Sequence, residues 1–328
     1  MISELQRRLI NRFQGGLPLV ERPYASMARA LACSEDELLG NLQQMLDQGT
    51  LSRFGPLYDA VRLGGGLTLA ALSVPQNRFA EVTRQVNAFE EVAHNYQREH
   101  ALNMWFVLAT GDPRQVNTTL QDIACKTRLP VYDFRKLEEF YVGLWLDLQN
   151  DGAVNTVPLT DHESSAQHEY LVDDIDRQIV RQTQAGLLLE SDPWQSIADR
   201  AGIDRSTLMQ RLQAMLSAGV IRRIGAVPNH YRLGLKANGM TVWDVPDGLA
   251  REAGEEIGKL DFVSHCYLRP RHPPLWRYNL FAMVHGHDRA QVEGKTTRIA
   301  QLLGPRSLAH EVLFSCAILK KTGMRLAA

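Results

Sequence analysis

The sequence lacks the features that mark a membrane protein or a disulfide-stapled secreted domain. No apolar run among its 328 residues reaches the roughly 18 residues of a membrane-spanning helix. Residues 1–13 have the pattern of an amphipathic helix rather than of a signal peptide. The four cysteines, Cys33, Cys125, Cys266 and Cys316, are too far apart in sequence to suggest a zinc site or a redox motif, which indicates reduced thiols. We therefore expect a cytoplasmic protein.

An excess of either charge is also missing. The chain has 36 Lys and Arg against 37 Asp and Glu, a formal net charge of -1, so no global positive field draws it to DNA or to anionic lipid. Any anion site must therefore be local. The length is about twice the ~150 residues expected for one domain, which predicts at least two hydrophobic cores.

The chain is a tandem duplication. A shift of 170 residues superimposes similar residues over some fifty positions without a gap, the signature of an internal repeat. The matched pairs include Gly16 with Gly186, Leu17 with Leu187, Pro23 with Pro193, Leu42 with Leu212, Met45 with Met215, Gly49 with Gly219 and Arg62 with Arg232. Between the copies, residues 150–170 are polar and have the composition of a solvated linker.

Each copy divides again into a helical part and an α+β part. In the second copy, apolar periodicity and capping residues predict helices over 171–183, 193–201 and 204–216. Two extended runs, 220–227 and 231–235, follow as a small wing, so the outline is a winged helix-turn-helix. The remainder has the order strand, helix, strand, strand, helix, strand, which is the ferredoxin-like unit.

The predicted fold class is therefore α+β, with the two copies forming an internal pseudo-dimer. In the first copy the last predicted strand of the ferredoxin-like unit covers residues 131–142. The predicted domains are helix-turn-helix domains at 1–64 and 171–235, ferredoxin-like (AsnC-like) domains at 65–149 and 236–328, and the linker at 150–170.

The recognition helices are poorly suited to DNA. Such a helix normally presents Lys, Arg, Asn or Gln from its first turn. In the first copy this turn carries Glu35, Asp36 and Glu37, which would repel phosphate. The second copy, with Arg205 and Gln210, is more permissive. We expect the helix-turn-helix domains to serve mainly as a packing scaffold.

The two α+β domains share the pattern H-x-Y-x-R on a predicted strand. Because side chains alternate along a strand, the three side chains project from one face, where an imidazole, a phenol and a guanidinium converge. An asparagine on the next strand can supply an amide to the same region. The residues are His94, Tyr96, Arg98 and Asn103 in the first copy and His265, Tyr267, Arg269 and Asn279 in the second.

Two stretches of the second copy, residues 218–240 and 262–286, contain no Asp or Glu. Their arginines and histidines suggest a pocket for a polyanion, because each charge-assisted hydrogen bond to a carboxylate contributes ~1.5–3 kcal/mol. An insertion at 270–275, rich in proline, predicts a stiff loop at the rim. The further candidate ligand-binding residues are Arg222, Arg223, His230, Arg271 and Arg277.

Each candidate also has a structural interpretation. Tyrosine is common in strands for packing reasons, and the two asparagines can simply tie down a hairpin edge. The histidines and arginines recur at equivalent positions in both copies, which favours a functional role for them.

Around these residues the sequence resembles the Lrp/AsnC-like siroheme decarboxylases, in particular the fused NirD and NirL type. The resemblance covers nearly the whole chain and rests on the helix-turn-helix, on AHNYQREHALNMWFVLATGD in the first half, and on ANGMTVWDV and SHCYLRPRHPPLWRYNLFAMVHG in the second. It implies a carboxy-lyase that removes CO₂ non-oxidatively from two acetate side chains of siroheme, giving 12,18-didecarboxysiroheme for d-type haem biosynthesis.

The resemblance directs attention to the histidine, tyrosine and arginine positions. We expect His94, Tyr96, His265 and Tyr267 to supply the catalytic groups, with a protonated histidine as proton donor, while the arginines hold peripheral carboxylates. His94, His230 or His265 could instead be an axial ligand to the substrate iron. No cofactor beyond the iron tetrapyrrole substrate is implied, and no metal site of the protein's own. Asn95 of the first copy becomes Cys266 in the second, which leaves open whether both halves are active.

Two other functions share these features. One is an Lrp/AsnC-type ligand-sensing transcription regulator, against which the acidic first turn at residues 35–37 argues. The other is a tetrapyrrole-binding chaperone without turnover. For assembly, a homodimer and a complex with related NirG- or NirH-type subunits both stay open, whereas membrane association and DNA binding are not expected.

Overall fold

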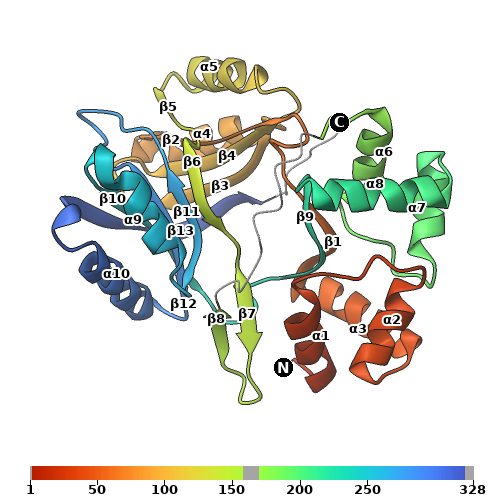
Figure 1. The fold of residues 1–328 in the computed structure, drawn as a ribbon. Coiled ribbons are helices and arrows are strands. Elements are labelled where there is room, and N and C mark those ends of the chain that lie inside the picture. The colour runs from red at the N-terminus through yellow and green to blue at the C-terminus, as the bar shows by residue number, and fades with distance from the viewer. Residues whose placement is uncertain (1, 158–169, 322–328) are drawn as a thin grey trace.

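The computed structural model describes residues 2–157 and 170–321. The helix-turn-helix domains of the two halves pack together on one side, and their α+β domains merge on the other (Figure 1). Within the described ranges, no helix has the length and apolar character needed to cross a lipid bilayer.

Each helix-turn-helix domain contains three helices whose starts follow from local sequence. Ser3 and Asp173 begin the first helix of each half with a reciprocal capping box. Ser34 and Asp204 cap the third helix of each half through their side-chain oxygens. The helices are α1 (Glu4–Phe13), α2 (Pro23–Leu31) and α3 (Glu35–Asp47), then α6 (Asp174–Thr183), α7 (Pro193–Ala201) and α8 (Arg205–Ser217).

The predicted wing within the second copy is wrong. Strand β9 (Ile221–Pro228) pairs antiparallel with β1 (Leu51–Tyr58) of the other half. Residues 231–235 form no strand, because the chain turns there through hydrogen bonds from Leu233 to Asn229 (3.0 Å) and from Leu235 to His230 (2.9 Å). The two helix-turn-helix domains therefore share one hydrophobic core instead of carrying separate wings.

The α+β domains contribute to one nine-stranded sheet with the order β5-β2-β4-β3-β13-β10-β12-β11-β6. Helices α4 (Phe79–Asn87), α5 (Gln115–Thr127), α9 (Ala250–Gly258) and α10 (Arg289–Leu303) belong to this part, with short 3-10 turns at Gln76–Arg78, Asp247–Leu249 and Gly304–Arg306. The strands are β2 (Gly66–Leu72), β3 (Val92–Arg98), β4 (Met104–Thr110), β5 (Val131–Phe134), β6 (Glu138–Val142), β10 (Ala237–Asp244), β11 (Val263–Leu268), β12 (Leu280–Gly286) and β13 (Ala309–Lys321).

The last strands of the two halves pair across the halves. Strand β13 lies between β10 of its own half and β3 of the first half, and β6 pairs with β11 of the second. The single strand predicted over 131–142 is therefore split: β5 stays in its own half and β6 crosses to the other. Because β5 and β6 form the two edges of the sheet and only residues 135–137 join them, the sheet curls and brings its edges together.

The curled sheet has a helix-covered side and an interior side. The interior contains an aromatic cluster with members from both halves, Trp105 and Phe134 from the first and Trp276 and Phe281 from the second. The ring centroids of Trp105 and Trp276 are 5.2 Å apart, and those of Trp276 and Phe281 are 5.7 Å apart. The insertion at 270–275 thus delivers Trp276 into the shared core, where it is 1% exposed.

Part of the predicted linker is ordered as a hairpin. Strand β8 (Val154–Val157) pairs with β7 (Trp145–Leu148), although residues 150–170 read as solvated linker. The cause is a tertiary contact. Gln14, which follows α1 as its C-cap, donates to Leu146 O (2.5 Å) and accepts from Leu146 N (3.0 Å), and this ties the hairpin to the helical core. The remaining linker residues 158–169 lie outside the described part of the chain.

Candidate active site

The two H-x-Y-x-R triplets lie on equivalent strands, β3 and β11, with Arg269 directly after the end of β11, and they face the interior of the sheet. The intervening residues point the other way, toward the helices. Asn95 donates to Asn87 of α4 (2.9 Å), and the Cys266 thiol lies 3.5 Å from Gly254 O of α9. The alternation expected from the sequence is therefore observed in both halves.

Both triplets also run in the same direction. Four antiparallel pairings separate β3 from β11 in the sheet order, so the two strands are parallel to each other. The two histidines consequently lie toward one end of the sheet and the two arginines toward the other. At the arginine end, the Arg269 guanidinium lies 5.6 Å from the ring centroid of Phe281, a member of the aromatic cluster.

The first triplet is largely buried. Burial and then the nearby Lys321 lower the pKa of His94 to about 4, so its imidazole is neutral at pH 7. Burial raises the pKa of Tyr96 to about 12. Burial also lowers the pKa of Arg98 to about 10, which still leaves it charged, and its Nη1 donates to Leu313 O (2.6 Å).

The second triplet repeats this arrangement with more charge around it. Burial, reinforced by Arg222 and Arg269, lowers the pKa of His265 to about 4 despite the opposing effect of Glu139. Burial raises the pKa of Tyr267, whose ring centroid lies 4.7 Å from the Arg269 guanidinium. Arg269 stays charged with a pKa of about 10 and donates through Nη1 to the carbonyl of Phe134 in the other half.

His230 lies in the same environment as both triplets. Its ring centroid is 4.9 Å from that of His285 and 4.3 Å from that of Tyr231. Burial, then Lys321 and His265, lower the pKa of His230 to about 4. Lys321 also lowers the pKa of His94. His230 is therefore coupled electrostatically to His265 of the second triplet and shares Lys321 as a neighbour with His94 of the first. The tyrosine at 231 and the lysine at 321 were not predicted as site residues, and no motif in the sequence singles them out.

Arg222 and Arg223 belong to β9. Arg222 acts on His265 and Tyr267 of the second triplet, whereas Arg223 contacts Trp145 and has no acidic partner among the described residues. Arg222 forms ion pairs with Asp59 (2.6 Å) and Glu139 (3.1 Å), both from the first half. Burial alone would lower the pKa of Arg222, but these two carboxylates more than compensate and raise it. Arg223 lies 4.7 Å over the Trp145 ring, and burial lowers its pKa to about 10.

The two predicted asparagines have structural roles. Asn103 exchanges two hydrogen bonds of 2.9 Å with the backbone of Val74, and Asn279 exchanges bonds of 3.1 and 2.9 Å with the backbone of Val245. Each side chain thus ties the start of one strand to the end of its neighbour. These bonds fit the hairpin interpretation of Asn103 and Asn279. Asn279 also donates to Asp247 (3.0 Å) and lines a cavity together with Arg269, so its role in substrate binding stays a prediction.

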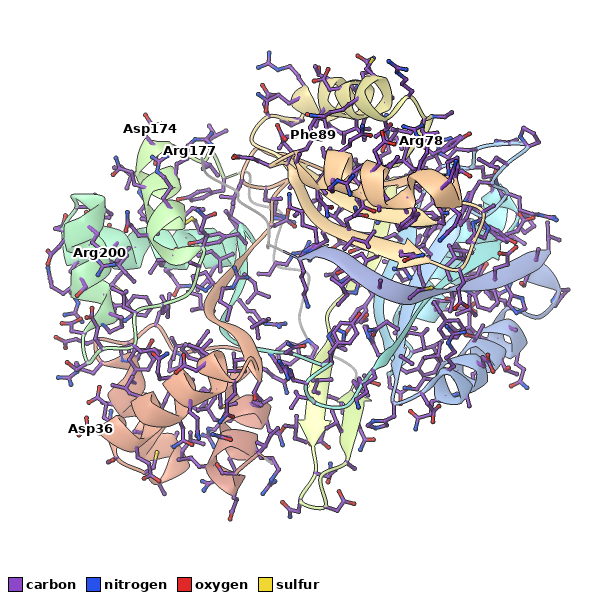
Figure 2. The ribbon with its side chains drawn as sticks, turned by 180° about the vertical axis from the view of Figure 1, so that it is seen from behind. Asp36, Arg78, Phe89, Asp174, Arg177 and Arg200 are labelled. Atoms are coloured by element: carbon purple, nitrogen blue, oxygen red, sulfur yellow. The ribbon has the colours of Figure 1, made fainter. Side chains whose placement is uncertain are left out.

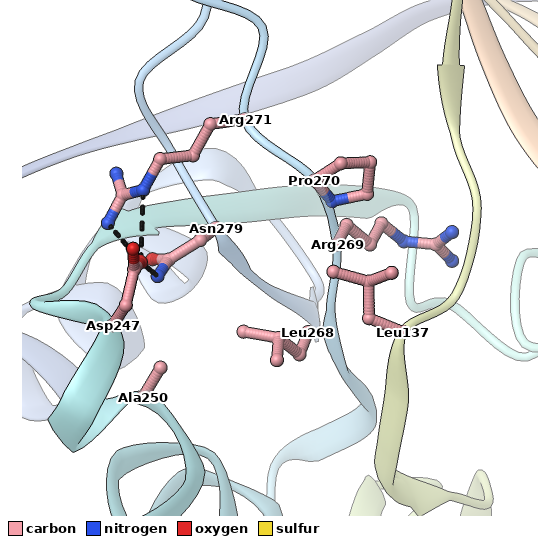
Figure 3. A pocket seen from close by; sticks show the side chains of 8 residues that line it. All are labelled: Leu137, Asp247, Ala250, Leu268, Arg269, Pro270, Arg271 and Asn279. Carbon is pink, nitrogen blue, oxygen red and sulfur yellow. Dashed lines mark hydrogen bonds and ion pairs between the residues drawn. The ribbon is translucent and has the colours of Figure 1, made fainter.

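Arg271 and Arg277 form ion pairs with acidic residues outside the acid-free stretches. Both bind the buried carboxylate of Asp244, at 2.5 and 2.6 Å, and Arg271 also binds Asp247 (3.2 Å). Figure 3 shows Arg271 and Asp247 on one side of a cavity of about 330 Å³, with the Arg269 guanidinium pointing away from them. The acid-free stretches of sequence therefore obtain their counter-ions from other segments, which sequence composition could not reveal.

Several buried polar atoms of the site have no hydrogen-bond partner among the described residues. Buried polar groups in proteins are nearly always paired, so each such atom calls for an explanation such as a bound ligand. The atoms are His94 Nδ1, Arg98 Nε, Arg223 Nε, His230 Nε2 and Arg269 Nε. Three of these five belong to arginine and can only donate, which fits a ligand rich in carboxylate oxygens.

The basic residues of the second recognition helix are engaged within the protein. Arg205 pairs with Asp192 (2.9 Å), and Arg211 pairs with Asp173 (2.9 Å). In the first half, the acidic first turn of α3 reaches the outer edge of the helical part, where Figure 2 shows Asp36 on the side away from the large sheet. Neither helix therefore presents a free basic first turn.

The lowered histidine pKa values predict that acid destabilises the free protein. In the unfolded chain histidine titrates near pH 6.5, whereas His94, His230 and His265 titrate at about 4 in the folded protein. The unfolded chain binds more protons between these values, so this stability is fully present above pH 6.5 and is lost as the pH falls toward 4. Each histidine is expected to contribute about 1 kcal/mol between pH 7 and pH 5.5.

Urea unfolding at both pH values measures this effect. The variant His230→Gln should show a smaller loss of unfolding free energy over the same interval than the wild type. Equal losses in the two proteins would contradict a neutral, buried His230.

Comparisons with known proteins agree with this architecture. Two family models each match twice: the AsnC-like ligand binding domain over 62–140 and 232–320, and the siroheme decarboxylase NirDL-like HTH domain over 6–51 and 176–222. They confirm that both kinds of domain are duplicated and that the fold is of the AsnC-like α+β class.

Individual relatives extend over the whole chain or over one half of it. The siroheme decarboxylase of Hydrogenobacter thermophilus is 31% identical over 332 residues, covering 97% of this chain and 93% of that protein. The siroheme decarboxylase NirH subunit of Paracoccus pantotrophus is 54% identical over 154 residues, 47% of this chain and 96% of that protein.

A solved structure matches at full length. The crystal structure of the siroheme decarboxylase NirDL in co-complex with an iron-uroporphyrin III analogue superimposes with a TM-score of 0.73 at 27% identity, covering 99% of this chain and 95% of that one. Together with the full-length relative, this match confirms the resemblance inferred from the sequence. The chain belongs to the siroheme decarboxylase family.

Proposed function

We propose that this chain removes CO₂ from two acetate side chains of siroheme and yields 12,18-didecarboxysiroheme, a step toward d-type haem. Besides family membership, one structural observation carries the proposal: the buried Nε atoms of Arg98, Arg223 and Arg269 have no hydrogen-bond partner among the described residues. Siroheme is a macrocycle with many carboxylates, so it offers the acceptors that these donors lack.

The arginines would bind and orient the substrate. Arg98 and Arg269 each use Nη1 on a backbone carbonyl and leave Nε unpaired. Arg223 also has an unpaired Nε, and its guanidinium is confined by the Trp145 ring. Charges that are already desolvated and fixed bind a carboxylate without further ordering of the side chain, which favours a reactive orientation of the acetate.

The histidines would handle the proton. Decarboxylation breaks the bond between the acetate CH₂ and CO₂ and leaves the electron pair on the macrocycle, so one proton is needed for each methyl group formed. His94 and His265 are neutral in the free protein, which differs from the protonated donor expected from sequence. A polycarboxylate bound nearby would raise their pKa by its negative charge, so we propose that the donor is protonated as substrate binds.

Anaerobic incubation of the purified chain with siroheme tests the function. Product mass should fall in two steps, each by one CO₂, with methyl groups replacing two acetates. A tetrapyrrole-binding chaperone would change the absorption spectrum of siroheme without changing its mass. A transcription regulator would leave siroheme unchanged and shift a specific operator fragment in a gel, and either result would refute the enzyme.

The same assay tests the assembly. The NirH relative corresponds to only half of this chain, so a single chain can supply the equivalent of two such subunits. We propose that the purified chain is active alone, as monomer or homodimer. Turnover that requires an added NirG- or NirH-type subunit would instead show that a complex is the working unit.

A further inference from the structure

A chain of buried hydrogen bonds is attached to His265 on the side away from Tyr267. His265 Nδ1 lies 2.9 Å from the hydroxyl of Ser264, and the same hydroxyl lies 2.7 Å from His285 Nε2. His285 Nδ1 is in turn hydrogen-bonded to Asn238 Oδ1. Ser264, His285 and Asn238 are 1%, 4% and 5% exposed, so water does not compete for these bonds.

The described residues of the first half form no such chain. The strand registers make Ala93 the counterpart of Ser264 and Ala109 the counterpart of His285. By the pairing of the first strand, Leu67 corresponds to Asn238. All three counterparts are apolar, and His94 Nδ1 has no hydrogen-bond partner among the described residues.

The amide oxygen of Asn238 fixes the direction of the chain. Since Oδ1 only accepts, His285 must carry its proton on Nδ1. Burial and the charge of nearby Lys295 keep His285 neutral, so its Nε2 is an acceptor and takes the hydroxyl proton of Ser264. The alternative acceptor for that proton, Met283 O, is 3.5 Å away and competes weakly.

With its own proton donated to His285, the Ser264 oxygen is left to accept from His265. His265 Nδ1 therefore carries a proton, and because the ring is neutral its Nε2 carries a lone pair. We propose that Ser264, His285 and Asn238 are positioning residues that hold His265 as the Nδ1–H tautomer and keep the lone pair of Nε2 free to take up the proton that this histidine transfers to the substrate. The two motif histidines are then chemically unequal, since His94 Nδ1 has no hydrogen-bond partner among the described residues that would fix its proton. The role of His265 toward the substrate rests on the proposed function, whereas its tautomer in the free protein does not.

Nitrogen NMR of the free protein, labelled with ¹⁵N in the histidine rings, tests the tautomer directly. His265 is identified among the ten histidines by the signals that disappear in His265→Gln. We expect its Nδ1 to resonate as a protonated nitrogen and its Nε2 as an unprotonated one. His272, whose Nε2 lies 2.9 Å from Asp133 O, provides an internal reference with the opposite tautomer.

The variant Ser264→Ala installs the residue that the first half has at this position. Both ring nitrogens of His265 should then move toward averaged shifts, because neither tautomer is selected. Thr241→Val is the matched control, since it removes another buried hydroxyl of the same half that bonds to Ala282 O and Trp243 instead of to this chain. The control should leave the His265 signals in place.

The result can refute the inference at two points. A proton on Nε2 of His265 in the wild type would reverse the direction of the hydrogen-bond chain. This measurement uses the wild-type protein and does not depend on whether a variant folds. Unchanged His265 signals in Ser264→Ala would show that the serine does not select the tautomer.

Activity supplies an independent arm. If the chain decarboxylates siroheme, Ser264→Ala should be slower by about 10- to 100-fold, the usual cost of losing a group that orients a reactive imidazole, while Thr241→Val keeps its rate. Full activity in Ser264→Ala would remove these residues from the mechanism. An inactive wild type would refute the proposed function and leave the tautomer result standing.

Discussion

Replacing His265 by alanine is expected to lower the decarboxylation rate by about 10²- to 10⁴-fold, the range that a positioned proton-transfer group contributes. We choose His265 for this substitution because it combines two features. It belongs to a triplet whose tyrosine and arginine share its face, and a hydrogen bond to Ser264 (2.9 Å) fixes its ring. The rate is measured from product mass under anaerobic single-turnover conditions.

His287→Ala is the matched control for this substitution. His287 lies in the same half but is exposed, and its Nδ1 contacts Gly234 O (3.1 Å) at the surface. Its loss should leave the rate unchanged. If His265→Ala kept full turnover and the absorption spectrum of bound siroheme were also unchanged, His265 would be neither a proton-transfer group nor a ligand of the substrate iron.

The same measurement on His94→Ala addresses the unequal halves. A loss similar to that of His265→Ala would show that both triplets take part in turnover. A small loss for His94→Ala would assign the chemistry to the second half, where the hydrogen-bond chain lies. Either result answers a question that the duplicated motif leaves open.

Local features were predictable from the sequence because they depend on local interactions. The caps at Ser34 and Asp204 and the proline at the start of α2 and α7 set the helices. Strand alternation placed the triplets on one face. In each case the physical cause acts over a few residues, so a single sequence contains the whole signal.

Pairings between the two copies could not be predicted in the same way. The residues at 220–227 have the sequence pattern of a strand, and this pattern does not show whether the strand pairs within its own copy or with β1. Only the packing of the shared helical core selects the pairing with β1. The split of the predicted strand at 131–142 also depends on the partner copy, because β6 needs β11 as its neighbour.

The sequence also misleads about which arginines are free to bind an anion, because their acidic partners come from segments distant in the sequence. Arg222, Arg271 and Arg277 stand in acid-free stretches, yet Asp59, Glu139 and Asp244 from other segments neutralise them. Arg98, Arg223 and Arg269 keep their charge without a carboxylate partner among the described residues. The anion site is therefore defined by which arginines lack acids in space, a property that appears only after the two halves are folded together.

The aromatic cluster that joins the halves should dominate stability. Trp276 is 1% exposed, its ring centroid lies 5.2 Å from both Trp105 and Phe134, and its Nε1 donates to Tyr278 O (3.0 Å). Trp276→Ala would leave a cavity between domains that cannot move independently, because strands paired across the halves connect them. The free energy of unfolding is expected to fall by about 3–5 kcal/mol, as for other buried tryptophans.

Urea unfolding followed by circular dichroism measures this loss, and Leu275→Ala is the matched control. Leu275 is the last residue of the insertion and directly precedes Trp276, but it is 43% exposed, so its truncation should cost within about 0.5 kcal/mol. A change below about 1 kcal/mol for Trp276→Ala would mean that the cluster does not hold the halves together. Because the Arg269 guanidinium lies 5.6 Å from the Phe281 ring of this cluster, siroheme binding should weaken together with stability in Trp276→Ala and not in the control.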